Sequence, residues 1–153
     1  LMYTLDSHIY DTNFSILQES RISMHFVCSV DHPLAARDQI TAEELTKQPF
    51  LLTEKGMSYR RLMDEQLAAK SLEIKPLFVS GNADLICYLV EKGVGFSLMP
   101  DYVTRPYVEK GTLCYVNVPE IKLEVWTQLL HHRDKWISEP MRIVIDYLHR
   151  CVL

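Results

Sequence analysis

Segments in which apolar residues recur at helical spacing alternate along this chain with short apolar runs. Residues 80–100 show both patterns in succession. Asn82 is typical of a helix start, and Gly93 is typical of the left-handed residue that ends a helix. Phe96 to Met99 form a short, mostly apolar run, as a buried strand does. The segment therefore predicts a helix, a glycine turn and a strand. The apolar stripe of the helix would consist of Leu85, Ile86, Leu89 and Val90.

The same alternation extends along the whole chain, which indicates an α/β fold. Apolar runs predict strands at 2–5, 22–30, 50–53, 72–79, 113–118 and 123–130, and a brief edge element at 16–17. Pro76 interrupts the strand at 72–79, which suggests an edge strand or a bulge. Helical spacing predicts helices at 58–70, at 101–109 with a break near Pro106, and from Ser138 onward. The buried face of the last helix would carry Met141, Val144, Ile145, Leu148 and Val152.

A capping box marks one further helix start. In Thr41-Ala42-Glu43-Glu44, the threonine hydroxyl can accept the amide of Glu44, whose carboxylate can reach back to the amide of Thr41. Ile40 and Leu45 supply the hydrophobic residues that flank such a box. These residues predict a short helix that ends before Pro49.

Charge and hydropathy exclude two classes of partner for the chain itself. The formal net charge is −4 and no Lys/Arg cluster is present, whereas nucleic-acid binding needs a basic face. No apolar stretch is long enough to span a bilayer, so we expect no membrane partner. The chain opens at Leu1 in a strand-like segment without an initiator methionine, which suggests a fragment.

The four cysteines predict buried, reduced thiols in a cytosolic protein. They are far apart in the sequence, and each sits in an apolar run, where a free cysteine behaves as a small hydrophobe. No His or Cys pair has metal-ligand spacing, so neither a metal nor another cofactor is predicted. The cysteines are Cys28, Cys87, Cys114 and Cys151.

Short matches to catalytic motifs fail on inspection. His132-Arg133-Asp134 starts like a kinase catalytic loop, but the magnesium-binding asparagine is replaced by Glu139. Ser97 follows Gly95, but Met99 stands where a nucleophile elbow needs its second glycine. We therefore predict that the chain is not an enzyme.

Two loops that lead from predicted strands into predicted helices are the candidate site. They are Glu54 to Ser58 and Ser80 to Asp84. In open α/β sheets, ligands bind beyond the carboxyl ends of strands, where helix N-termini present free amides. These amides, with Ser58, Ser80 or Asn82, could hold a small anion. Each residue alone is as well explained as a helix cap, but the two loops together favour a ligand site.

Several motifs in order resemble the effector-binding domain of a LysR-type transcriptional regulator. The resemblance covers nearly the whole chain. It rests on Asp31-His-Pro-Leu-Ala35, Ile40-Thr-Ala-Glu-Glu-Leu45, Pro49-Phe-Leu-Leu52, Glu91-Lys-Gly-Val-Gly-Phe-Ser-Leu-Met-Pro100 and the terminal helix.

This resemblance implies a periplasmic-binding-protein-like (type 2) fold of two α/β lobes, with the first lobe incomplete. Residues 49–129 would form the second lobe, and residues 1–48 and 130–153 would be the remnant of the first. The strands that cross between lobes would lie near 50–52 and 129–132. The winged helix-turn-helix is absent from this chain, so DNA binding would belong to a missing N-terminal domain.

In such a regulator a small effector binds between the lobes of a cytoplasmic, oligomeric protein. A solute-binding protein of a transport system is the alternative with the same architecture. Apolar surface on the incomplete first lobe predicts a dimer or a swapped assembly, which light scattering would detect. By position, the residues that would contact the effector are Thr4, Thr53, Glu54, Gly56, Met57, Ser58, Ser80, Gly81, Asn82 and Met99.

Overall fold

The chain forms two compact units, which we describe separately. The computed structural model describes residues 1–151, apart from the side chains of His149 and Cys151, and Val152 lies outside this range. Unit 1 combines residues 1–22 with the chain from Val125 onward, and unit 2 is the continuous stretch Ser23–Glu124. These bounds differ from the predicted lobes, since residues 23–48 belong to the same unit as the segments that follow them.

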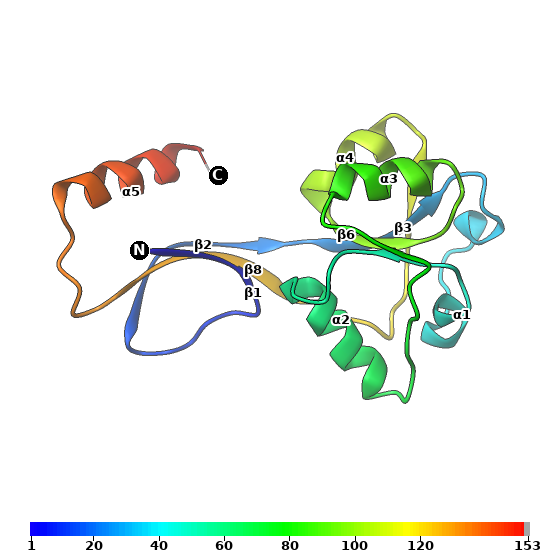
Figure 1. Cartoon of the computed structure of the whole chain (residues 1–153), viewed down its shortest axis with the longest axis horizontal. Helices are drawn as coiled ribbons and strands as arrows, with labels where there is room; N and C mark the ends of the chain where they lie inside the picture. The colour runs from blue at the N-terminus through cyan, green and yellow to red at the C-terminus, as the bar shows by residue number, and fades with distance from the viewer. Residues whose placement is uncertain (152–153) are drawn as a thin grey trace. The chain divides into compact units, whose positions relative to one another are not determined.

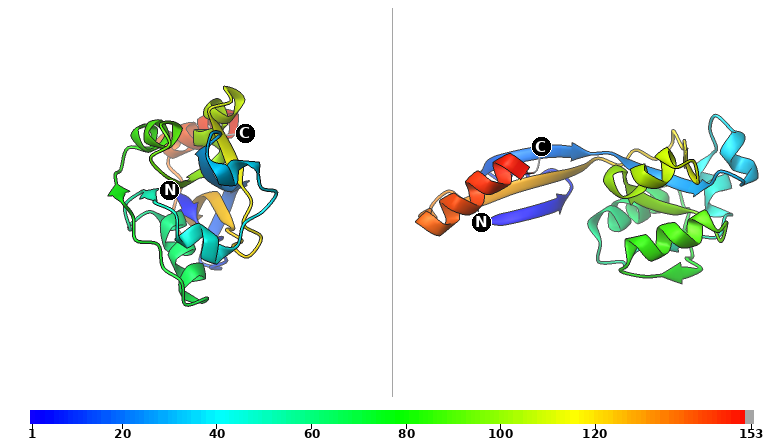
Figure 2. Two further views of the ribbon diagram at one scale, coloured as in Figure 1. Left: turned by 90° about the vertical axis from the view of Figure 1, so that its right-hand side faces the viewer. Right: turned by 90° about the horizontal axis from the view of Figure 1, so that it is seen from above.

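Unit 1 is a three-stranded antiparallel sheet with one helix. Its strands are β1 (Met2–Asp6), β2 (Phe14–Ile22) and β8 (Val125–His132), in the order β1-β8-β2. Helix α5 (Glu139–Cys151) lies over this sheet in Figure 2. The brief element predicted at 16–17 is in fact part of the nine-residue strand β2, which has a register shift between Ile16 and Gln18.

Unit 2 is built on a second antiparallel sheet, in the order β6-β3-β7. Its strands are β3 (Met24–Ser29), β6 (Ser97–Pro100) and β7 (Leu113–Val116). A short parallel pair, β4 (Leu51–Leu52) and β5 (Phe78–Val79), joins it through a bridge from Phe50 to Phe96. The helical segments are η1 (Pro33–Ala36), α1 (Ala42–Thr46), α2 (Ser58–Ala68), α3 (Ala83–Glu91) and α4 (Asp101–Glu109).

The helices of unit 2 cover both faces of its sheet. Figure 1 shows α3 and α4 on one side of β3 and β6, with α1 and α2 on the other. The α3 side is closed by a cluster of buried side chains from α3 and the strands, with Val103, Tyr107 and Val108 of α4 packed against it. The cluster consists of Val27, Leu51, Ile86, Cys87, Val90, Met99 and Leu113.

Three sequence-based predictions of local structure were wrong. The strand predicted at 22–30 is interrupted at Ser23, where the chain leaves the sheet of unit 1 and begins the sheet of unit 2. Of residues 72–79 only Phe78 and Val79 form a strand, because Pro76 has no amide hydrogen for a ladder bond. Helix α4 is continuous through Pro106, which is exposed. Proline has no amide hydrogen to donate to the carbonyl four residues earlier, but on an exposed face water can donate to that carbonyl instead.

Two predicted helix ends are confirmed in atomic detail. The Thr41 hydroxyl accepts the amide of Glu44 at 3.1 Å, and the Glu44 carboxylate accepts the amide of Thr41 at 2.9 Å. Gly93, which follows the C-cap of α3, has a φ of 75°, a left-handed conformation that suits glycine.

The capping box predicts a specific loss of stability in acid. Its hydrogen bond from the Thr41 amide, together with Arg37, lowers the pKa of Glu44 from 4.5 to about 2. A carboxyl whose folded-state pKa is depressed stabilises the fold above its unfolded pKa, and the stabilisation is lost as the pH falls through the folded value. We expect the urea midpoint to fall between pH 4.5 and about 2, and to fall less in Glu44→Gln.

The urea midpoints of the wild type and of Glu44→Gln are measured by far-UV circular dichroism. The variant is needed because other carboxyls titrate in the same pH range. Glutamine keeps an oxygen that can accept the Thr41 amide, so the variant removes only the charge. Equal shifts of the midpoint in the two proteins would contradict the assignment to Glu44.

Candidate functional site

The two candidate loops leave the same edge of the parallel strand pair. Leu51 lies opposite Phe78 and Leu52 opposite Val79, so β4 and β5 end side by side. The amide of Ser80 donates to the carbonyl of Leu52 at 3.1 Å, which continues this pairing past the end of β5. The loop at 53–57 then leads into α2, and the loop at 80–82 leads into α3.

The side chain of Glu54 lies near the loop that contains Gly81. A Cβ atom built on Gly81 would lie 3.5 Å from Oε1 of Glu54, which is ordinary van der Waals contact. Glu54, Gly81 and Asn82 are all exposed. The two loops therefore begin at the same edge, with the Glu54 carboxylate near Gly81, and their joint role in ligand binding stays a prediction.

The loop at 80–82 is ordered by its own side chains. Oδ1 of Asn82 accepts the amide of Leu85 at 3.0 Å, as a helix cap does. The hydroxyl of Ser80 accepts the amide of Asn82 at 3.1 Å. This cap uses only the carbonyl oxygen of Asn82, so its Nδ2 group remains a hydrogen-bond donor at the start of α3.

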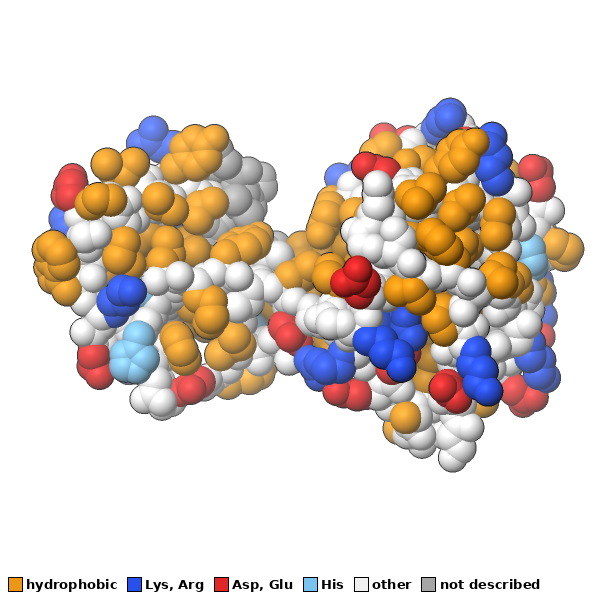
Figure 3. Space-filling model, in the orientation of Figure 1, with side chains coloured by type: hydrophobic (Ala, Val, Ile, Leu, Met, Phe, Trp, Pro, Cys, Tyr) orange, Lys and Arg blue, Asp and Glu red, His pale blue; other side chains and the backbone are white. Residues whose placement is uncertain are grey.

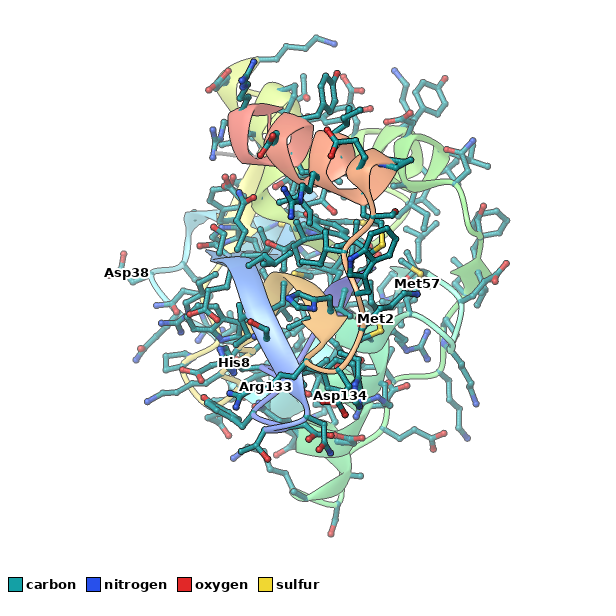
Figure 4. The ribbon with its side chains drawn as sticks, turned by 90° about the vertical axis from the view of Figure 1, so that its left-hand side faces the viewer. Met2, His8, Asp38, Met57, Arg133 and Asp134 are labelled. Atoms are coloured by element: carbon teal, nitrogen blue, oxygen red, sulfur yellow. The ribbon has the colours of Figure 1, made fainter. Side chains whose placement is uncertain are left out.

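The start of α2 is organised differently. Met57 occupies the N-cap position, and among the described residues no side chain caps this end of the helix. The amide of Met57 donates to the carbonyl of Glu54 at 3.0 Å, which closes a turn around exposed Gly56. Met57 is 40% exposed in this turn, where Figure 4 labels it, and Ser58 is half-buried. A positive helix end thus lies close to Glu54.

Two of the ten predicted residues are buried. Thr53 is only 4% exposed, and its carbonyl accepts Nη1 of Arg60 at 3.2 Å. Met99 is fully buried in the core cluster of unit 2. Burial raises the pKa of Tyr59, and a hydrogen bond with Thr53 partly offsets that rise. The side chains of Thr53 and Met99 are both buried rather than part of an open surface, and contact of either with an effector stays a prediction.

Thr4 lies in unit 1, on β1, and the other nine predicted residues lie in unit 2. Its hydroxyl donates to the carbonyl of Gln128 on the neighbouring strand at 3.4 Å. A part for Thr4 in effector binding therefore stays a prediction.

Sequence reasoning missed Arg60, which is the charged residue most tightly built into this region. It is 2% exposed, and its Nε lies 3.0 and 2.9 Å from the two carboxylate oxygens of Asp64. The spacing of four residues between an arginine and an aspartate on one helix could have signalled this pair. Arg60 fastens α2 to the loop that precedes it through the carbonyl of Thr53.

A hollow of about 510 Å³ lies between α2 and the segment 72–76. Figure 3 shows Lys and Arg side chains on this face around α2. The hollow contains none of the ten predicted residues, and the guanidinium of Arg60 beside it is already bonded to Asp64. Its lining includes Lys55, Arg60, Asp64, Leu67, Leu72 and Lys75.

The rejected kinase-like motif has a local structural explanation. His132 ends β8, and Nδ1 of its ring accepts the amide of Asp134 at 3.3 Å. Arg133 and Asp134 form the turn after that strand, as Figure 4 shows. Within the described residues, no group of three or more His, Cys, Asp or Glu residues could hold a metal ion. No helix in that part of the chain is long and apolar enough to cross a membrane.

Comparison with known proteins gives consistent results. The family model for the LysR substrate binding domain matches residues 6–151. The uncharacterized HTH-type transcriptional regulator YwqM of Bacillus subtilis is 32% identical over 133 residues, which are 86% of this chain and 43% of that protein. YeiE of Escherichia coli, also an uncharacterized HTH-type regulator, is 31% identical over 73% of this chain and 38% of its own length. The chain thus spans less than half the length of these curated relatives.

Solved structures share the fold at low sequence identity. The effector binding domain of QuiR, in complex with shikimate, has a TM-score of 0.75 at 18% identity, covering 97% of this chain and 70% of that one. The regulatory domain of CcmR from Synechocystis, in complex with 2-PG, has a TM-score of 0.77 at 17% identity, covering 97% and 72%. The α/β fold is therefore the periplasmic-binding-protein-like fold of these domains. With the family match over nearly its whole length, the chain belongs to the LysR substrate-binding domain family.

Proposed function

We propose that this chain is the effector-sensing domain of a LysR-type transcriptional regulator and that its two loops in unit 2 contact the effector. The observation that carries this proposal is the parallel pairing of β4 with β5, continued by the hydrogen bond from the Ser80 amide to the Leu52 carbonyl, which places the starts of two helices at one edge. Ligands of α/β proteins bind at such edges. QuiR and CcmR, which share the fold, are described with small molecules bound.

The charges of the loops favour a particular class of effector. The positive start of α2 attracts negatively charged oxygens. The Nδ2 group of Asn82 can donate a hydrogen bond to them. The exposed carboxylate of Glu54 repels an anion but accepts hydrogen bonds. A small carboxylate or phosphate that also carries hydroxyl groups satisfies both requirements, because its anionic end can face the helix starts and a hydroxyl can face Glu54.

Asn82→Ser separates ligand binding from helix capping. Serine caps helices about as well as asparagine, so the melting temperature of the free protein should stay close to that of the wild type. It lacks the Nδ2 donor, and the loss of one hydrogen bond to a charged group should weaken binding about tenfold. The measurement is a thermal-shift screen of the chain against small hydroxylated carboxylates and phosphates, followed by calorimetric titration of those that stabilise it.

Asn117→Ser is the matched control. It makes the same chemical change in unit 2 but outside the two loops, at a side chain that donates to the carbonyl of Asp38 at 3.3 Å. Its affinity for each stabilising compound should equal that of the wild type. Equal affinity in Asn82→Ser for every stabilising compound would refute the site.

In the whole protein, we propose that DNA is bound by an N-terminal winged helix-turn-helix outside this chain. An effector can then switch the regulator only if it binds one of two conformations more tightly. The named relatives are transcriptional regulators, which supports this function over the solute-binding alternative and over an enzyme. A cytoplasmic location and a homo-oligomeric state are parts of the same proposal. Exposed Tyr3 and Tyr147 of unit 1 offer apolar surface for a second copy.

A further inference from the structure

The sheet of unit 2 places two cysteines directly opposite each other. Cys28 on β3 and Cys114 on β7 are 86 residues apart in sequence but are register partners in the antiparallel pair. Their Sγ atoms lie 3.5 Å apart, and both residues are free thiols. A disulfide has an S–S distance of about 2.05 Å, so the two sulfurs, which are in non-bonded contact, must approach by a further ~1.5 Å.

The backbone between these cysteines also suits a disulfide. The amide of Val30 donates to the carbonyl of Thr112 at 3.3 Å, which marks this pair of residues as hydrogen-bonded. Hydrogen-bonded pairs recur every second residue along an antiparallel ladder, so Cys28 and Cys114 form the next one, with a Cα separation of about 5.5 Å. Disulfides span Cα separations of about 4.4–6.8 Å. The Cβ atoms of directly opposite residues lie about 4.5–5.5 Å apart, whereas those of a disulfide lie about 3.5–4.5 Å apart. Rotation of the side chains, with an approach of the two strands by up to about 1 Å, would therefore close the bond.

We propose that Cys28 and Cys114 are a redox modification site, at which a peroxide forms a reversible disulfide between β3 and β7. Reducing intracellular conditions keep most cytosolic thiols free, and the disulfides that do form there are usually transient and redox-sensing. The cysteine pair lies outside the loops proposed for effector binding, so this inference is independent of that proposal.

The exposure of the two thiols sets the order of the reaction. Cys114 is partly exposed on β7, an edge strand of its sheet, and Cys28 is fully buried. The peroxide therefore meets Cys114 first. The sulfur of Cys114 attacks one peroxide oxygen, and the O–O bond breaks. The other oxygen departs as water with the thiol proton, and Cys114 becomes a sulfenic acid.

Cys28 completes the disulfide. Its sulfur attacks the sulfur of Cys114, the S–O bond breaks, and the hydroxyl leaves as water with the proton of Cys28. Two thiols and one hydrogen peroxide thus give one disulfide and two water molecules. Burial raises the pKa of Cys28, which keeps its thiol protonated and slows its own reaction with peroxide. The second step should therefore become faster as the pH rises.

The test uses the full chain treated with millimolar hydrogen peroxide, then alkylated, digested and mapped by mass spectrometry. We expect the protein mass to fall by two hydrogen atoms, the peptides of Cys28 and Cys114 to be linked, and dithiothreitol to restore both thiols. Cys114→Ser and Cys28→Ala should each abolish this mass loss. Melting curves of the two variants establish that each is folded.

Cys151→Ser is the control, because it leaves the pair intact and should lose the same mass as the wild type. A stable sulfinic acid on Cys114 with an unchanged Cys28 would overturn the proposal. So would the same mass loss in folded Cys114→Ser, or a linked peptide pair that does not contain both Cys28 and Cys114.

Discussion

Replacing Phe50 with alanine is expected to lower the free energy of unfolding of unit 2 by about 3–5 kcal/mol. The side chain is fully buried, and its ring lies 6.3 Å from that of Phe26 and 5.9 Å from that of Phe96. Alanine would leave a cavity at the point where β4 bridges to β6. The surrounding rings cannot close this cavity without breaking their own contacts, so both the lost burial and the empty space destabilise the fold.

Far-UV circular dichroism in urea measures this loss. Both tryptophans, Trp126 and Trp136, belong to unit 1, so their fluorescence reports on unit 1 and serves as a separate signal. The matched control is Phe78→Ala, which removes a phenylalanine that is 37% exposed in unit 2 and should cost about 1 kcal/mol. If Phe50→Ala costs no more than Phe78→Ala, the aromatic cluster is not the centre of this core.

Gly95→Ala is expected to destabilise unit 2 by about 2–4 kcal/mol. A Cβ atom on Gly95 would lie 2.4 Å from the carbonyl oxygen of Pro49 and 3.0 Å from its carbonyl carbon. The same oxygen accepts the amide of Phe96 at 2.8 Å, so it cannot move away without weakening that bond. The third contact, with Cδ1 of Leu51 at 3.2 Å, involves a side chain, but the two closest contacts are with backbone atoms, and rotation of a side chain cannot relieve them.

Gly56→Ala is the control for this substitution. No described heavy atom lies within 4 Å of a Cβ built on Gly56, and its φ is outside the left-handed region. Alanine there should leave stability unchanged or raise it by up to about 1 kcal/mol, because it restricts the unfolded chain. The same urea titration measures both variants. A Gly95→Ala protein as stable as Gly56→Ala would show that the approach of Pro49 to Gly95 is not tight in solution.

Local signals in the sequence predicted local structure well. The capping box at Thr41, the cap at Asn82 and the left-handed turn at Gly93 each depend on residues within one turn of the chain, and the structure has all three. The stripe of α3 was less well predicted. Leu85 is 40% exposed, and Cys87 is buried in its place, because the sheet rather than the hydropathy pattern decides which face turns inward.

Features that depend on distant residues could not be predicted from the sequence. The apolar pattern at 22–30 is continuous, but the partners of the two halves lie in different sheets, which only the pairing with β8, β6 and β7 reveals. The approach of Cys28 to Cys114 depends on a register between strands 86 residues apart. In the candidate site, helix-start chemistry identified both loops. Sequence alone could not tell exposed Glu54 from buried Thr53, nor show that Arg60 is buried.

The strand order of unit 1 determines which of the two units can fold first during synthesis. Strands β1 and β2 both pair with β8, which lies between them but is made last of the three. Unit 2 is continuous and has all its strands once Glu124 has left the ribosome. Strands β1 and β2 must wait for residues 125–132 before their sheet can form. While unit 2 folds, β1 and β2 therefore lack their β8 partner, and strand edges without a partner are prone to aggregate.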